Sequence, residues 1–122
     1  MDFNLTEDRQ MLSDTLTRYL AEQYQIEHRN SVAYDAPFHD PSKWTEMAKL
    51  GMFSALANEA DGGFGGTGAD IAVVFEALGH ALNCDPALPL LMSSRLLSAA
   101  GQEQAALLEG TAHYAVAIAE PD

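Results

Sequence analysis

Apolar side chains recur every three or four residues through the first quarter of the chain, which is the spacing of an amphipathic helix. Leu12, Leu16 and Leu20 share one face, and acidic residues fill the other faces. Thr6 suits the capping position before the first turn, and the two acids that follow it suit the positive end of a helix. The pattern predicts a long helix from about residue 6 to about residue 30.

A second helix is marked by its two ends. Asp40 and Pro41 supply a capping acid followed by proline at the first helical position, and Gly51 is suited to end the helix in a left-handed conformation. The apolar run 52–56 that follows is too short to be assigned to a strand or to coil.

Three later segments also follow helical patterns. The apolar positions of 70–82 share one face, while 88–100 is apolar almost all round, which is typical of a helix buried on most sides. Residues 102–109 predict one more short helix, ended by Gly110. The sequence therefore predicts an all-α fold of about five helices.

The last residues depart from this pattern. Residues 114–119 are small and β-branched, which predicts a strand, and no second strand is evident in the sequence. Because one strand cannot form a sheet, we expect residues 1–111 to form a helical domain and residues 112–122 to be the first strand of a β domain that is not included.

Composition narrows the function classes. The chain has 122 residues and 13.1 kDa, which suits one domain, and its formal net charge is −12. That charge disfavours nucleic acid and anionic membrane surfaces as partners. The single cysteine, Cys84, and the lack of a long apolar run or a basic leader predict a cytoplasmic protein with no membrane segment.

Five glycines fall within residues 62–68, and the stretch from Gly63 to Gly68 formally matches the G-x-G-x-x-G pattern of dinucleotide-binding loops. That fingerprint needs a preceding strand, whereas the preceding residues are acidic and polar. A P-loop also needs a lysine, and none occurs after Lys49. A surface turn between two helices is the favoured interpretation.

Candidate chemistry is sparse. His80 and Cys84 are four residues apart and the other histidines are scattered, so no metal-ligand spacing and no catalytic residue is predicted. Ser93, Ser94 and Ser98 interrupt an apolar helix. Their hydroxyls either bond back to their own helix or provide polar points in the wall of a pocket.

Several short motifs, each modest alone, occur in the order found in the N-terminal domain of acyl-CoA dehydrogenases. The first residues resemble those that begin the first helix of the family. Later segments resemble five sequence motifs of the family, written in one-letter code as "LG-hydrophobic", "yGGlG", "EelG", "GteeQ" and "TEP". The matching segments are Met1–Glu7, Leu50–Met52, Asp61–Gly65, Glu76–Gly79, Gly101–Gln104 and Ala117–Pro121. The resemblance covers nearly the whole chain.

The resemblance implies an orthogonal helical bundle in an FAD-dependent enzyme of lipid metabolism that dehydrogenates acyl-CoA thioesters. The family's catalytic base lies in a later helical domain, so this chain is expected to lack it and to be inactive alone. The resemblance assigns the acyl-pocket wall to Leu91, Ser93, Ser94 and Leu97. It assigns the edge of the flavin site to Ile118 and Ala119.

Two departures from the family pattern bear on function. Ala119 replaces the usual threonine before Glu-Pro, and the segment between Leu107 and Tyr114 is short. Both features resemble the small-subunit type of heteromeric acyl-CoA dehydrogenases, so a non-catalytic small subunit is one alternative. A homo- or hetero-oligomer with another chain of the family is expected. A free-standing helical interaction module is the alternative from another class.

Overall fold

The computed structural model describes residues 3–118, and within that range the chain is entirely helical apart from its connections. The described elements are α1 (Glu7–Gln23), α2 (Ile26–Val32), α3 (Pro41–Lys49), α4 (Met52–Leu56), the 3-10 helix η1 (Glu59–Asp61), α5 (Gly68–His80), α6 (Ala87–Ala99) and α7 (Ala105–Leu108). The predicted all-α fold is confirmed. There are more helices in the described range than the five expected, because the predicted first helix is divided into α1 and α2 and the unassigned run 52–56 forms α4.

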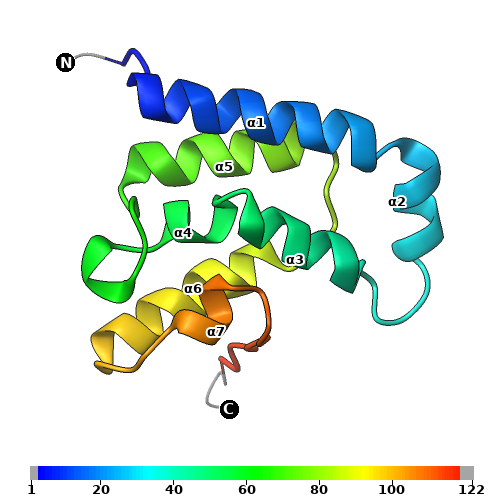
Figure 1. Ribbon diagram of the computed structural model, residues 1–122. Coiled ribbons are helices and arrows are strands. Elements are labelled where there is room, and N and C mark those ends of the chain that lie inside the picture. The colour runs from blue at the N-terminus through cyan, green and yellow to red at the C-terminus, as the bar shows by residue number, and fades with distance from the viewer. Residues whose placement is uncertain (1–2, 119–122) are drawn as a thin grey trace.

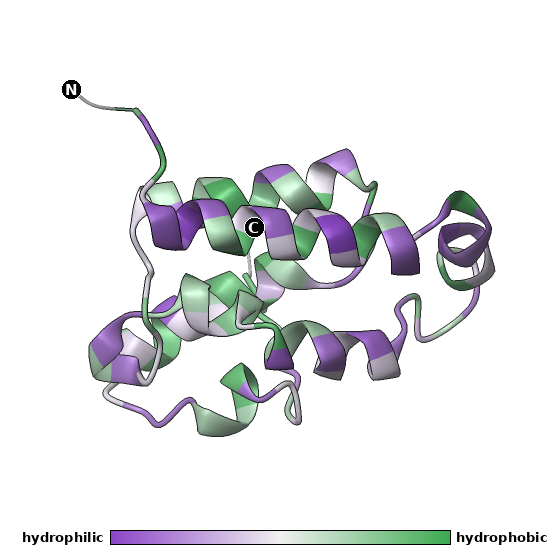
Figure 2. Cartoon of the chain, turned by 45° about the horizontal axis from the view of Figure 1, so that its top comes forward, coloured by the Kyte–Doolittle hydropathy of each residue, from purple (hydrophilic) through white to green (hydrophobic). Residues whose placement is uncertain are grey.

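The helices lie in three tiers (Figure 1). The α1 and α5 helices pack together on one side, α3 and α4 occupy the middle, and α6 and α7 lie on the other side. Although it has only five residues, α4 contacts α3, α5, α6 and α7. Along the outer helices hydrophilic residues alternate with hydrophobic ones, as expected when one face is buried (Figure 2).

The core is built around α4. Four of its five residues are buried, and Phe53 packs against Trp44 of α3 with ring centroids 4.4 Å apart. Leu16 and Leu20 of α1 are fully buried in the same cluster, as their helical spacing predicts. The short apolar segment that sequence patterns left unassigned is thus the centre of the fold.

The predicted first helix is wrong in its length, because the chain leaves the helical conformation at Tyr24 and Gln25 before α2 begins. No glycine or proline marks this break. Tyr24 is buried, and its hydroxyl donates a hydrogen bond to Asp85, which precedes α6. We infer that this tertiary contact, rather than a local breaker, ends α1.

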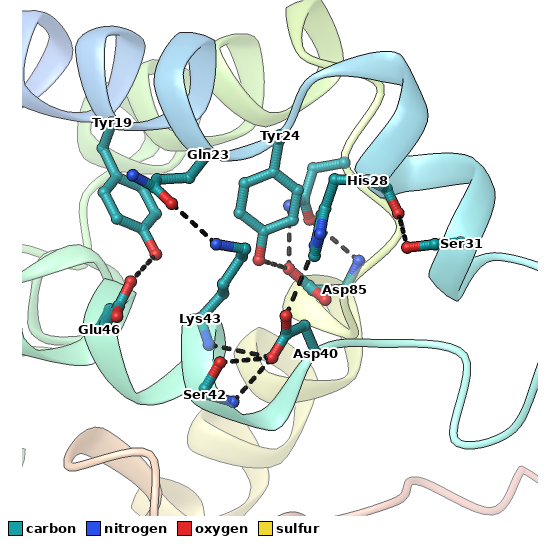
Figure 3. Close-up of polar contacts among 11 residues, drawn as sticks. Tyr19, Gln23, Tyr24, His28, Ser31, Asp40, Ser42, Lys43, Glu46 and Asp85 are labelled. Atoms are coloured by element: carbon teal, nitrogen blue, oxygen red, sulfur yellow. Dashed lines mark hydrogen bonds and ion pairs between the residues drawn. The ribbon is translucent and has the colours of Figure 1, made fainter.

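A polar seam joins α1 and α2 to α3 and to the loop before α6 (Figure 3). The Tyr19 hydroxyl donates to Glu46 at 2.6 Å, and Lys43 Nζ donates to Gln23 at 2.8 Å. Burial, followed by the hydrogen bond to a carboxylate, raises the pKa of Tyr19 well above its usual value, and the same causes raise the pKa of Tyr24. Both phenols therefore remain neutral donors.

The predicted ends of α3 are confirmed. The Asp40 carboxylate accepts hydrogen bonds from the N–H groups of Ser42 (3.0 Å) and Lys43 (3.4 Å), and Pro41 occupies the first turn. Gly51 has a φ of +89°, the left-handed conformation expected at the end of this helix. It also marks the start of α4.

Residues 111–118 leave α7 without forming a regular element. Within the described range, no backbone hydrogen bond involves residues 113–118. The strand predicted for this tail, and the domain boundary at residue 111, stay predictions, because a strand forms only where a partner strand is present. None of the helices in the described range is long and apolar enough to cross a membrane.

Candidate functional site

A groove of about 370 Å³ separates the first turn of α6 from the segment that follows α7. Its walls are mostly apolar, as is typical of ligand-binding clefts. Trp44 contributes to the lining although its side chain is almost completely buried. The lining residues are His39, Trp44, Pro86, Pro89, Leu90, Leu107 and the segment Ala112–Val116. The groove thus lies between the two elements that the sequence singles out, the apolar helix and the tail.

The α6 helix has an inner face and an outer face, and both are apolar. Leu90 and Ser94 are buried on the inner face. On the outer face, Leu88 and Leu96 are 55% and 57% exposed, and Met92 is half-buried between them. These three residues are spaced by four, so they form a stripe along one side of the helix. An exposed apolar stripe next to a groove is the kind of surface that a ligand or another domain covers.

Ser94 is committed to a hydrogen-bond pair inside the domain. Its hydroxyl donates to Gln104 Oε1 at 2.6 Å, and Gln104 Nε2 donates back to the Ser94 carbonyl at 3.1 Å. Both residues are buried. The pair fixes α6 to the start of α7, a role that neither interpretation of the serines anticipated.

The other predicted pocket residues surround the helix rather than forming one surface. Ser93 is buried and its hydroxyl has no hydrogen-bond partner in the described structure. Leu91 and Leu97 are half-buried and pack against the core. None of the four predicted residues lines the groove.

For the predicted flavin edge, Ile118 is 74% exposed and Ala119 lies outside the described residues. Ile118 does not line the groove, which is formed instead by the residues of the tail that precede it. The sequence patterns did not show that Trp44 lines the groove or that Leu88 and Leu96 are exposed on the outer face of α6. A stripe at i, i+4 and i+8 is present in the sequence, but in a helix that is apolar all round it cannot be told from the core-facing side.

The glycine-rich loop is a turn that closes the end of α4. The N–H of Phe64 donates to the Ser54 carbonyl (2.9 Å), that of Gly65 to Ala57 (3.0 Å) and that of Gly66 to Ala55 (2.8 Å). These N–H groups therefore satisfy carbonyls that the short helix leaves free, and they are not available to a phosphate.

Close packing explains the glycines themselves. A Cβ added at Gly63 or Gly65 would lie less than 3.0 Å from the carbonyl oxygen of Ala57 or Ala55 respectively. Arg95 of α6 anchors the loop from the other side, because its guanidinium donates to Asn58 Oδ1 at 3.1 Å and to the Gly66 carbonyl. The orientation of α6 is therefore coupled to the loop.

The loop leads into α5 through a capping box. The Thr67 hydroxyl accepts from the N–H of Asp70, and the Asp70 carboxylate accepts from the N–H of Thr67. Arg9 of α1 adds an ion pair to Asp70 at 2.8 Å. Burial alone would raise the pKa of Asp70, but the hydrogen bonds from Arg9 and Thr67 outweigh it and hold this pKa below its usual value.

The described residues contain no group of three or more histidines, cysteines or acids that could hold a metal ion.

Comparisons with known proteins agree with this architecture. The family model described as "Acyl-CoA dehydrogenase, N-terminal domain" matches residues 6–106. The solved structure titled "Crystal structure of the ChsE4-ChsE5 complex from Mycobacterium tuberculosis" contains a chain of similar fold. The TM-score is 0.80 at 24% sequence identity, and the match covers 93% of this chain and 33% of that chain. This chain thus spans about a third of the length of the solved chain. No curated protein sequence matches it.

Proposed function

Because this chain belongs to the acyl-CoA dehydrogenase family through the N-terminal domain of that family, we propose that it supplies one wall of the acyl-binding pocket in an acyl-CoA dehydrogenase. The observation that carries the proposal is the apolar outer stripe of α6, Leu88, Met92 and Leu96. An acyl chain needs an apolar wall with few polar groups. The stripe adjoins the groove at the start of the same helix, where Pro89 and Leu90 form one side.

The four residues predicted from the sequence take different parts in this proposal. Ser94, paired with Gln104, holds α6 in position from the inner side. Leu91 and Leu97 pack the helix onto the core at the margins of the stripe. The hydroxyl of Ser93 is buried and has no hydrogen-bond partner in the described structure. A contact between this hydroxyl and a polar group of a bound thioester would require the surrounding side chains to move away from it.

The tail would supply one edge of the flavin site. The backbone groups of residues 113–118 have no backbone hydrogen bonds within the described range, and the Ile118 side chain is exposed. Polar backbone groups and an apolar side chain are therefore available to the flavin ring. The N–H groups of Phe64, Gly65 and Gly66 in the glycine loop already donate to carbonyls of this chain, so they are not available to the flavin phosphates. We therefore propose that this chain supplies an edge of the FAD site and not the whole site, with Ile118 and Ala119 as the residues expected from the family resemblance.

When bound, FAD supplies the capacity to accept the β hydrogen of the acyl chain as a hydride. The residues of this chain contribute position and exclusion of water, since α6 and the tail would cover one side of the acyl chain. No described carboxylate lies on the outer stripe of α6, so we place the base that removes the α proton on another part of the enzyme. The chain alone is then inactive.

A non-catalytic small subunit is a second candidate. It is favoured by one comparison, because the similar solved chain comes from a complex of two named components. In that case this protein would pair with a larger chain of the family and shape its pocket. Purified complex with one FAD for every two chains would support this candidate, and one FAD for every chain would favour a homo-oligomer.

The proposal is tested by placing a charge on the stripe. In the assembled dehydrogenase, Leu96→Glu is expected to lower kcat/KM for an acyl-CoA at least about tenfold, because a carboxylate in an apolar pocket is costly to desolvate. Met11→Glu is the matched control, since Met11 is 67% exposed on α1, across the bundle from α6 (Figure 1). Equal activity of the two variants would refute the assignment of the pocket wall to α6.

A further inference from the structure

Three aromatic rings lie close together where His113 of the tail meets Trp44 of α3, and two of the three are histidines. The rings of His39 and His113 lie with their centroids 5.3 Å apart. The centroid of the His113 ring also lies 5.5 Å from that of Trp44, with an angle of 31° between the ring planes, and the His39 centroid lies 6.4 Å from the same indole. His113 belongs to the tail, whereas the other two rings belong to the connector before α3 and to α3 itself. The cluster is therefore a contact through which the tail is held on the bundle.

Protonation of one histidine stabilises this cluster, whereas protonation of both histidines destabilises it. A single imidazolium over the indole is stabilised by the ring electrons, because a cation within about 6 Å of a tryptophan face is attracted to it. A second proton places two positive charges on facing rings, and these charges repel. His39 Nδ1 lies 3.0 Å from the Pro37 carbonyl oxygen, so Nδ1 carries the hydrogen and Nε2 is the atom that takes the added proton.

Few other charges are present to compensate. Of the residues that line the groove, only His39, His113 and Tyr114 titrate, and the residues from α6 and α7 are apolar. Asp40 follows His39 in sequence, but one of its carboxylate oxygens accepts from the first turn of α3 and the other faces His28 at 3.6 Å. The second positive charge therefore has no dedicated partner.

We propose that His39, His113 and Trp44 form an acid-sensitive clasp that holds residues 112–118 against α3 at neutral pH and releases them when both imidazoles are protonated. Histidine is the side chain whose charge normally changes between about pH 5 and 8. Repulsion between the two imidazolium rings opposes docking of the tail once both rings carry a proton. Docking is therefore complete above that range and weakens as the pH falls through it. The inference rests on the ring contacts and not on the proposed enzymatic function.

The experiment uses the single tryptophan of the chain as its probe. Emission of Trp44 is recorded from pH 8 to pH 5, together with the helical circular dichroism signal. We expect the emission maximum to move to longer wavelength as the tail leaves and water reaches the indole, while the helical signal stays constant. Loss of the helical signal in step with the emission change would show general unfolding and overturn the proposal, as would an unchanged emission maximum.

Single variants separate the clasp from other effects of acid. His39→Gln removes the second charge, so its emission maximum is expected to stay constant down to pH 5. His80→Gln is the matched control, because His80 is an exposed histidine of α5 outside the ring cluster, and it should behave as the parent protein does. A wavelength shift in His39→Gln equal to that of the parent protein would overturn the proposal.

Discussion

Replacing Gly65 with alanine tests whether the glycine-rich loop is a packing device rather than a phosphate-binding loop. The added Cβ would lie less than 3.0 Å from the Ala55 carbonyl oxygen, 3.0 Å from the Ala55 carbonyl carbon and 3.1 Å from Asp70 Cγ. Two of these atoms belong to the backbone at the end of α4. The third belongs to a side chain already fixed by Thr67 and Arg9. None of them is the free end of a flexible chain.

The cost of this substitution follows from two contributions. Forcing extra volume into a packed site costs about 1–3 kcal/mol, and weakening the hydrogen bond from the Gly65 N–H to the Ala57 carbonyl costs about 1 kcal/mol more. We expect Gly65→Ala to lower the free energy of unfolding by about 3 kcal/mol. For a chain of this size that corresponds to a fall in Tm of roughly 10 °C.

Gly68→Ala is the matched control in the same loop. Gly68 is the first residue of α5, and a Cβ added there has no neighbour within 4 Å. Alanine restricts the unfolded chain more than glycine does, so Tm should stay constant or rise slightly. Both variants are compared by urea and thermal unfolding followed by circular dichroism. A loss of less than about 1 kcal/mol for Gly65→Ala, or an equal loss in both variants, would refute this account of the loop.

The remaining predictions concern contacts that hold α6 and α5 in place. Ser94→Ala leaves Gln104 Oε1 buried without its donor, and urea unfolding should show a loss of about 1–3 kcal/mol. Arg95→Met removes the guanidinium from the glycine loop. It should cost about 1–2 kcal/mol and speed hydrogen exchange at the loop amides, and unchanged exchange would contradict the anchoring role. Hydrogen bonds, including those from Arg9, hold the pKa of Asp70 below its usual value in the folded state. The Asp70 carboxylate therefore stabilises the folded state fully above its unfolded pKa of about 3.9. This stabilisation is lost as the pH falls through the folded pKa. In Asp70→Asn, the free energy of unfolding should therefore fall less steeply with decreasing pH than in the parent protein. An equally steep fall in both proteins would contradict this.

The sequence predicted those elements whose ends carry local chemistry. Asp40 and Pro41 fixed the start of α3, and Gly51 fixed its end, because capping and left-handed φ depend on the residue itself. The break after α1 was not predictable, since Tyr24 ends the helix through a bond to Asp85, sixty-one residues away. Tertiary contacts of this kind leave no local signal.

The same distinction applies to the candidate site. The family resemblance assigned the pocket wall to the helix that is α6 in the structure, and this assignment stays a proposal; a segment that is apolar all round does not show which of its faces is outward. Ser94 was predicted to bond within its own helix or to line a pocket, and it bonds Gln104 instead, a partner that only packing brings close. Trp44 has no feature in the sequence that places it beside the tail.

We propose above that the outer face of α6 forms the acyl wall of the assembled dehydrogenase. The most direct measurement uses an acyl-CoA that carries a photoreactive group at the end of its acyl chain, followed by mapping of the labelled peptides. We expect labelling within residues 88–96, and we expect excess unmodified acyl-CoA to reduce it. Labelling confined to α1, or to other chains of the assembly with none on α6, would contradict it.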